Sequence, residues 1–189
     1  MTRQNELPIG LTQRLAASPT PNVQMRRSPR AGITIAIDPG ASGGFAIQYP
    51  GGRIHLEAMP DNDAERLEII KGAKDYADIE SVPILAVLEK VGGFVAPRGQ
   101  DGGGQPGSRM FNFGEGFGFL RGALLALGIP LRMVRPQEWQ KQLCLGAMKD
   151  KPARKRALKS KAQELYPDLK PTLSTCDALL ILDWAIRVL

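Results

Sequence analysis

The segment that most constrains the fold is an apolar run that ends in a carboxylate. Residues Ile33 to Ile37 are rich in β-branched side chains, and Asp38 closes the run just before Pro39 and Gly40. A run of this kind, bounded by Gly and Pro, is typical of a strand that is buried on both faces. The glycines that follow allow a phosphate group or a second backbone to approach closely. Asp38 is therefore either a metal ligand at the end of a strand or a turn former.

Two further acidic residues lie in comparable places. Glu89 ends the apolar run 84–88, and Asp177 opens the last apolar segment, which is long enough to favour a helix. Three carboxylates at the edges of three buried elements are expected to converge, and oxygen ligands suit a hard cation such as Mg²⁺. Because His55 is the only histidine, a zinc site is not expected. The alternatives are a solvated strand end for Glu89 and, for Asp177, a helix-capping box that begins at Ser174.

The charge is distributed unevenly along the chain, whose formal net charge is +6. Residues 132–161 hold ten Lys and Arg side chains against two acidic ones, and residues 1–30 hold five arginines against one glutamate. The remainder is net acidic and contains the three candidate carboxylates. A basic flank beside an acidic centre is typical of a metal enzyme that cuts a polyanion, because basic side chains neutralise backbone phosphates. A solvated helix face is the common alternative for a lysine-rich run.

Composition and cysteine usage indicate the class of protein and its setting. With 43% hydrophobic residues, the chain can form one globular domain, expected over 31–189. No apolar run approaches the ~20 residues that a membrane span needs. Cys144 and Cys176 form no spaced motif, so we expect a reduced intracellular setting. Residues 1–30 are predicted to be a flexible basic arm, although an organelle-targeting peptide has a similar composition.

The order of predicted elements indicates an α/β fold. Strands are expected at 33–38, 43–48, 53–59, 84–89 and 131–134. Helices are expected within 61–78, from Phe113 to Leu127, around Trp139, from about 150 to 166, and from Asp177 to Ile186. The glycine-rich segment 91–110 is expected to be a long irregular loop, which is usually functional or disordered. This order predicts a mixed sheet with helices on both faces.

Short motifs along this pattern occur in a familiar order. Asp38–Gly40, Leu88–Val91 and Asp177–Leu180 resemble the first, second and last catalytic motifs of RuvC-type Holliday junction resolvases. The middle of the chain is similar to phage and bacterial RuvC-like proteins in the segments Met110–Gly114, Gly128–Pro130, Val134–Pro136, Trp139–Lys141, Lys149–Lys151 and Leu165–Pro167. The resemblance covers roughly residues 33–187. It implies a ribonuclease H-like mixed β-sheet of about five strands with helices on both faces.

The resemblance also implies a function. It implies a homodimeric endonuclease that resolves four-way DNA junctions by paired nicks, with two Mg²⁺ ions per site that Mn²⁺ can replace. It also implies a place in the cytoplasm of a bacterial or phage-infected cell. Asp38, Glu89 and Asp177 would hold the metal for an in-line displacement, and Lys151 or Lys149 would approach the scissile phosphate. The residues expected to contact DNA are Arg98, Arg109, Phe111, Lys141, Lys149, Arg154, Lys155, Arg156 and Lys159. Base stacking by Phe111 is one role considered, but a core position is favoured.

The chain departs from this family in one place. The family usually carries an acid or a histidine three or four residues before the last aspartate, where this chain has Leu173 and Ser174. Asp183 lies about 600° around the helix from Asp177, so it is expected to face elsewhere. The departure leaves open a non-catalytic branched-DNA-binding protein of the same fold. Actin-like and sugar-kinase-like ATPases share the core but use two such domains, and 189 residues supply one.

Overall fold

A five-stranded mixed sheet forms the centre of the computed structural model, which describes residues 31–90, 107–146 and 150–189. The strand order is β3-β2-β1-β4-β5. The strands are β1 (Ile33–Asp38), β2 (Gly44–Gln48), β3 (Ile54–Ala58), β4 (Ile84–Glu89) and β5 (Leu131–Val134). β2 is antiparallel to β1 and to β3, whereas β4 runs parallel to β1 and to β5. The predicted mixed α/β sheet of five strands is confirmed.

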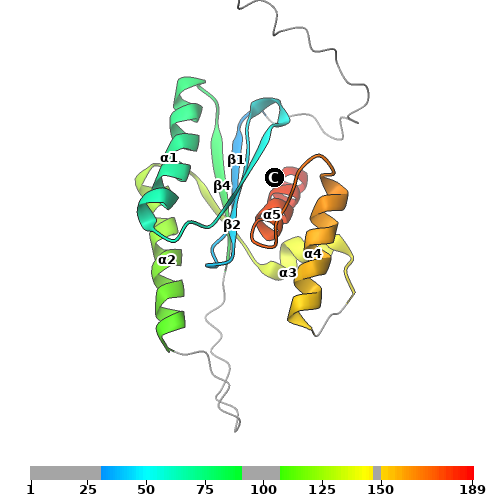
Figure 1. Cartoon of the computed structure of the whole chain (residues 1–189). Coiled ribbons are helices and arrows are strands. Elements are labelled where there is room, and N and C mark those ends of the chain that lie inside the picture. Colours follow the sequence, from blue (N-terminus) through cyan, green and yellow to red (C-terminus); the bar gives the residue numbers. More distant parts are fainter. Residues whose placement is uncertain (1–30, 91–106, 147–149) are drawn as a thin grey trace, which may run out of the picture.

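Helices cover both faces of this sheet (Figure 1). One face carries α1 (Asp63–Ile79) and α2 (Gly107–Ala126), and the other carries α3 (Pro136–Gln140), α4 (Lys151–Leu165) and α5 (Cys176–Val188). Two 3-10 turns complete the elements, η1 (Pro50–Gly52) and η2 (Lys141–Leu143). Among the described residues, no helix is both long and apolar enough to cross a membrane.

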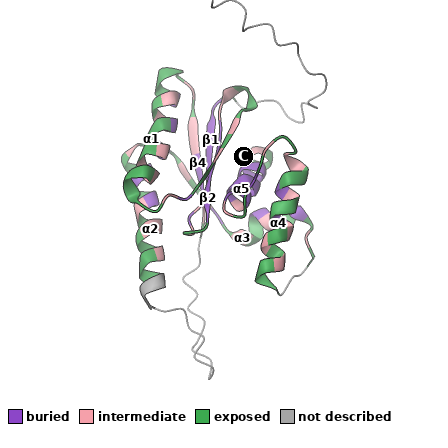
Figure 2. Ribbon diagram, viewed as in Figure 1, coloured by how far each residue is buried: buried purple, intermediate pink, exposed green. Residues whose placement is uncertain are grey.

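The strand β1 separates two hydrophobic clusters, because its side chains alternate between the faces of the sheet. Ile33, Ile35 and Ile37 belong to the cluster beneath α1 and α2, whereas Ala36 belongs to the cluster beneath α5. α5 packs directly on β1 and β2 and is almost wholly buried (Figure 2). The first turn of α5 is therefore held against the sheet, and Asp177 lies in that turn.

The observed boundaries agree with the predicted strands to within one residue, but two helices begin elsewhere. α1 begins two residues later than predicted because the Asn62 side chain caps it, accepting the backbone N–H of Glu65 at 2.9 Å. α2 begins at Gly107, so the prediction of loop up to residue 110 was wrong at its end. The reason is that Ser108 to Met110 contain no Gly or Pro to break a helix. The rest of that loop and the predicted basic arm, 1–30, lie outside the described residues.

Candidate active site

Two of the predicted acidic residues end neighbouring parallel strands. Ile37 of β1 pairs with Leu88 of β4, and Asp38 and Glu89 directly follow that pair. Both carboxylates therefore lie at the same edge of the sheet, the edge where parallel α/β sheets present their functional residues. The amino-terminal half of α2 and the first turn of α4 extend past this edge (Figure 1).

The turn after β1 fixes the position of Asp38. Its carboxylate accepts the backbone N–H of Gly40 at 3.2 Å. A Cβ atom on Gly43 would lie 2.7 Å from the Asp38 carboxyl carbon, so only glycine fits there. Asp38 is thus a turn former, and its role as a metal ligand stays a prediction.

Asp177 joins the same site through a lysine of α4. The ammonium nitrogen of Lys155 lies 2.6 Å from Oδ2 of Asp177 and 3.9 Å from Oδ2 of Asp38. The capping-box alternative for Asp177 is wrong. The N-cap of α5 is Thr175, and the backbone N–H of Ser174 donates to the Thr172 hydroxyl instead of to Asp177. The carboxylate of Asp177 is therefore available to the site.

Glu89 is held by a buried tryptophan. The indole N–H of Trp139 in α3 donates to Oε1 of Glu89 at 2.8 Å, and Trp139 is 1% exposed. Glu89 is therefore an oriented side chain, and the alternative of a solvated strand end is wrong. The sequence showed Trp139 only as part of a motif. Its contact with Glu89 joins residues 50 positions apart, which no local pattern reveals.

The electrostatics of the site show that negative charge is in excess. Burial, and then the charge of Asp177, raise the pKa of Asp38 to about 6, although Lys155 and the Gly40 N–H oppose the rise. Burial, and then the charge of Asp38, raise the pKa of Glu89 to about 7, against the hydrogen bond from Trp139. Burial is the main cause of both shifts, and repulsion between the carboxylates adds to it although Lys155 opposes it. A site of this kind attracts a further cation.

The donor set fits one hard cation better than two. Among the described residues, no group of three or more Asp, Glu, His or Cys side chains is arranged to hold a metal. Asp38 and Glu89 remain as a carboxylate pair, while Asp177 is paired with Lys155. Mg²⁺ is commonly bound by one or two carboxylates together with waters and substrate phosphates. The pair at the end of β1 and β4 therefore suits a single Mg²⁺.

Similar chains were found among solved structures. The chain resembles RuvC. A structure of T. thermophilus RuvC in complex with Holliday junction substrate has a TM-score of 0.47 and 13% sequence identity, covering 82% of this chain and 95% of that one. A second Thermus thermophilus RuvC structure has a TM-score of 0.45 and 15% identity, with the same coverage. No protein-family model matches the chain, and no curated protein matches it.

Among the residues that the RuvC resemblance assigns to the site, the lysines lie differently from expectation. Lys151, the expected catalytic lysine, is the exposed first residue of α4. Lys155, which was expected only to contact DNA, forms ion pairs with the carboxylates of Asp177 and Asp38. The two lysines lie one helical turn apart on the same side of α4. The catalytic role of Lys151 and the DNA contact of Lys155 stay predictions.

The other predicted DNA contacts are mostly exposed. Lys141, Arg156 and Lys159 are exposed, and the exposed Arg154 donates to the side chain of Gln140. Arg98, Lys149 and the side chain of Arg109 lie outside the described part of the chain.

The aromatic residues of α2 divide between surface and core. Phe111 is 70% exposed, so the core position favoured from the sequence is wrong for this residue. Phe113 is half-buried, and its ring centroid lies 6.3 Å from that of Phe117. The physical reason is that α2 packs on the sheet from about Leu120 onward, whereas its first turns extend beyond it (Figure 1).

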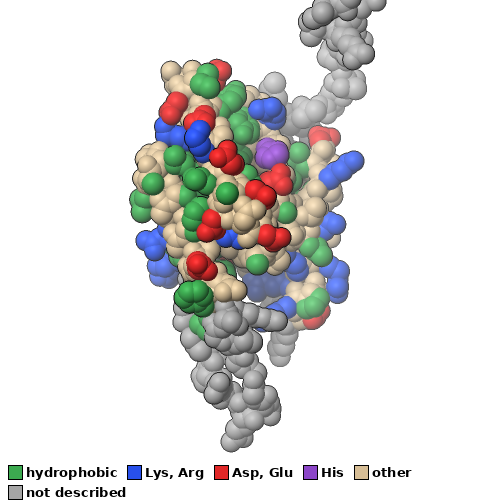
Figure 3. Space-filling view, turned by 60° about the vertical axis from the view of Figure 1, so that its left-hand side comes forward, with side chains coloured by type: hydrophobic (Ala, Val, Ile, Leu, Met, Phe, Trp, Pro, Cys, Tyr) green, Lys and Arg blue, Asp and Glu red, His purple; other side chains and the backbone are tan. Residues whose placement is uncertain are grey.

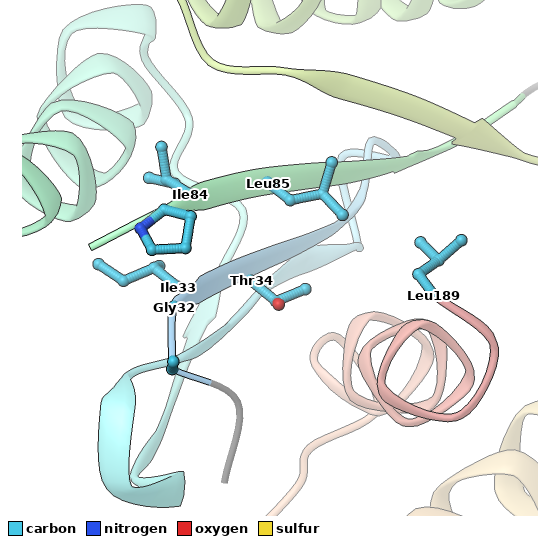
Figure 4. A pocket seen from close by; sticks show the side chains of 8 residues that line it. Gly32, Ile33, Thr34, Ile84, Leu85 and Leu189 are labelled. Carbon is cyan, nitrogen blue, oxygen red and sulfur yellow. The ribbon is translucent and has the colours of Figure 1, made fainter.

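Two other features lie apart from the carboxylate cluster. A cavity of about 400 Å³ lies at the opposite edge of the sheet, lined by Ala31–Thr34, Pro83–Leu85 and Leu189 (Figure 4). It is mainly apolar and contains none of the candidate site residues. Asp183 of α5 is 4% exposed, accepts the Tyr166 hydroxyl at 3.1 Å and pairs with Arg187. The expectation that Asp183 faces away from Asp177 fits these partners.

Proposed function

We propose that this protein is a divalent-metal-dependent endonuclease that cuts four-way DNA junctions, with its active site at Asp38, Glu89 and Asp177. The observation that carries the proposal is that Lys155 reaches both Asp177 and Asp38, at 2.6 and 3.9 Å, at the edge of the sheet where Glu89 ends the neighbouring parallel strand. The order of RuvC-type motifs along the sequence supports a branched-DNA substrate. The basic helix α4, which holds Lys155 beside the carboxylates, supports a polyanionic substrate.

The residues of the site have separate tasks in this proposal. Asp38 and Glu89 would hold the cation, which supplies Lewis-acid stabilisation of the charge that develops on the scissile phosphate. The Gly40 N–H orients Asp38, and the Trp139 indole orients Glu89. Hydrogen bonds of this kind, from the protein to a metal-binding carboxylate, keep the carboxylate in position and tune its basicity. Lys155 adds a fixed positive charge beside the place where the phosphate would lie.

DNA binding would involve surfaces beyond the carboxylates. Arg154, Arg156 and Lys159 would contact backbone phosphates, which position the DNA without reading its sequence. The exposed ring of Phe111 lies at the end of α2 that extends past the carboxylate edge, where a base of an opened junction can stack on it. Paired nicks in a symmetric junction need two active sites, so we expect a homodimer.

A second candidate function is a branched-DNA-binding protein that does not cut. Leu173 and Ser174 occupy the positions where the family usually has an acid or a histidine. The ion pair between Lys155 and Asp177 also occupies one of the three carboxylates. Both observations favour weaker metal binding than in a site with four ligands.

The test is a cleavage assay on a synthetic four-way junction, with linear duplex of the same sequence as the control substrate. We expect the full chain to nick the junction in Mg²⁺ and not in EDTA. Asp38→Asn should bind the junction with nearly the parent's affinity and cut it at least about 10³-fold more slowly, because it removes a charged ligand but keeps the shape of the turn. Binding without cutting by the parent would support the second candidate, and the absence of both would contradict both functions.

A further inference from the structure

The side chain of Lys155 occupies the space between two carboxylates of the site. Its nitrogen lies at hydrogen-bonding distance from Asp177 and within ion-pair distance of Asp38, 2.6 and 3.9 Å respectively. The three side chains are only 30%, 15% and 13% exposed, for Lys155, Asp177 and Asp38 respectively. Water screens such a group of charges less than it screens a surface ion pair, so the interaction is strong enough to hold the lysine in place.

The charges of the site balance around this lysine. Three carboxylates and one ammonium carry a formal charge of −2, which one divalent cation neutralises. A further acid one turn before Asp177 would make room for a second divalent ion. This chain has the exposed Leu173 and the hydroxyl of Ser174 there instead. The site therefore has one acidic ligand fewer than the family pattern, and the ammonium of Lys155 supplies a positive charge in place of a second metal ion, so the formal charges still balance.

The geometry points to a site in which Lys155 stands in for one of two divalent cations. We propose that this chain binds one divalent ion per site, at Asp38 and Glu89, and that the Lys155–Asp177 pair provides the second positive centre. The inference rests on the proposed function, because it concerns how the same site holds its cation. A lysine is a compact point charge, so it replaces the charge of a metal ion but not its coordination geometry.

The test is a titration of the full chain with Mn²⁺, in the absence of DNA, in which free Mn²⁺ is measured by electron paramagnetic resonance. We expect the parent and Lys155→Arg to bind one Mn²⁺ per chain. Lys155→Met should bind Mn²⁺ at least about tenfold more tightly, because a like charge has left the site. Lys155→Met combined with Ser174→Asp should bind two. The matched control is Lys161→Met, which removes a lysine of the same helix that pairs with Glu164 and should titrate like the parent.

The possible results separate this inference from the proposed function. Two Mn²⁺ ions per parent chain, or parent-like binding by Lys155→Met, would overturn the role of Lys155 and leave a metal-dependent nuclease intact. No Mn²⁺ binding by any form would overturn both. Because the parent and Lys155→Arg keep the positive charge, their stoichiometry decides the matter even if Lys155→Met fails to fold.

Discussion

Two charged helices on opposite faces of the sheet use their charges differently. In α1, cations pair with acids one turn away on the same helix. The ammonium of Lys71 lies 2.6 Å from Asp75, that of Lys74 lies 2.5 Å from Asp78, and Arg66 pairs with Asp63. A helix of this kind pairs each of its cations with its own acids, so no cation is left over for a partner. On the face shown in Figure 3, which includes His55, acidic side chains lie near the centre and basic ones mostly toward the margins.

The helix α4 carries charge that it does not neutralise. It holds six Lys and Arg side chains, and its one acidic residue, Glu164, pairs with Lys161 at 2.7 Å. Lys155 pairs instead with Asp177 of α5. Among the described residues, Arg156 and Lys159 have no ion pair and are exposed. The two helices therefore differ both in the number of their cations and in how these are paired, and unpaired exposed cations of the kind found on α4 are the ones that a polyanion would contact.

The largest expected difference between the two helices comes from removing charge on each of them in parallel. Replacing Arg154, Arg156 and Lys159 of α4 by Gln should weaken junction binding on the order of 100-fold or more. It should also lower the slope of log affinity against log salt by about three, one for each lost phosphate contact. Folding should survive, because these side chains are exposed.

The matched control for this experiment is the same number of substitutions on α1, namely Arg66, Lys71 and Lys74 to Gln. These cations already have partners on their own helix, so the salt slope should stay at the parent's value. Equal slopes for the parent and the α4 variant would show that α4 is only a solvated surface.

The acidic centre beside α4 should make stability depend on pH in the absence of metal. The folded chain binds protons at Asp38 near pH 6 and at Glu89 near pH 7, above the ordinary values of 3.8 and 4.5. The native state therefore holds more protons than the unfolded state between about pH 4 and 7, so the free energy of unfolding should fall as pH rises through this range. We expect a fall of about 4 kcal/mol between pH 5 and 8, measured by urea denaturation.

Two variants check the source of this pH dependence. Asp38→Asn combined with Glu89→Gln should flatten it. Asp75→Asn in α1 should keep it, because Asp75 lies outside the carboxylate cluster. A dependence that survives the double substitution would assign the effect to other groups.

The ion pair of Lys155 should contribute more to stability than an ion pair of α1. Lys155→Met leaves Asp38 and Asp177 facing each other without their shared cation, so we expect a loss of about 2 kcal/mol at pH 8. Lys71→Met removes an exposed pair and should change the unfolding midpoint much less. Urea denaturation of both variants and the parent measures the difference. Equal midpoints for the two variants would mean that Lys155 is not held in the site in solution.

The smallest expected effect concerns the orientation of Glu89. Trp139→Phe keeps most of the buried ring but removes the N–H that donates to the Glu89 carboxylate. Mn²⁺ affinity should fall by about tenfold, as it does when the outer contact of a ligand is lost. Trp184→Phe is the control, since Trp184 lies two turns after Asp177 in α5 and its ring faces the guanidinium of Arg132, 5.7 Å away. If both variants lose the same affinity, the effect comes from packing and not from the hydrogen bond.

The sequence predicted the parts of the site that depend on local patterns. The apolar runs before Asp38 and Glu89, punctuated by Gly and Pro, identified two strands and the edge at which their carboxylates lie. The basic run likewise identified α4. The residue types and the spacing of the apolar residues are enough to predict these features, because the spacing within one strand or helix indicates which of its faces is buried.

The remaining features depend on how distant elements pack together. The contacts from Lys155 to Asp177 and from Trp139 to Glu89 join residues 22 and 50 positions apart, respectively. The aromatic character of Phe111 favoured a core position, but only the structure shows that it lies in the part of α2 that extends beyond the sheet. A local pattern records which face is apolar, and it does not record what lies opposite that face.

The most direct test of the account measures affinity and cutting on the same four-way junction for two variants. Asp38→Asn should keep the parent's affinity and lose cutting. The α4 variant, with Arg154, Arg156 and Lys159 replaced by Gln, should lose affinity yet cut at nearly the parent's rate when protein is saturating. This result would assign cutting to the carboxylate cluster and DNA binding to α4. Loss of affinity in Asp38→Asn equal to that in the α4 variant would contradict the account, because the cluster would then be a docking element and not a site of catalysis.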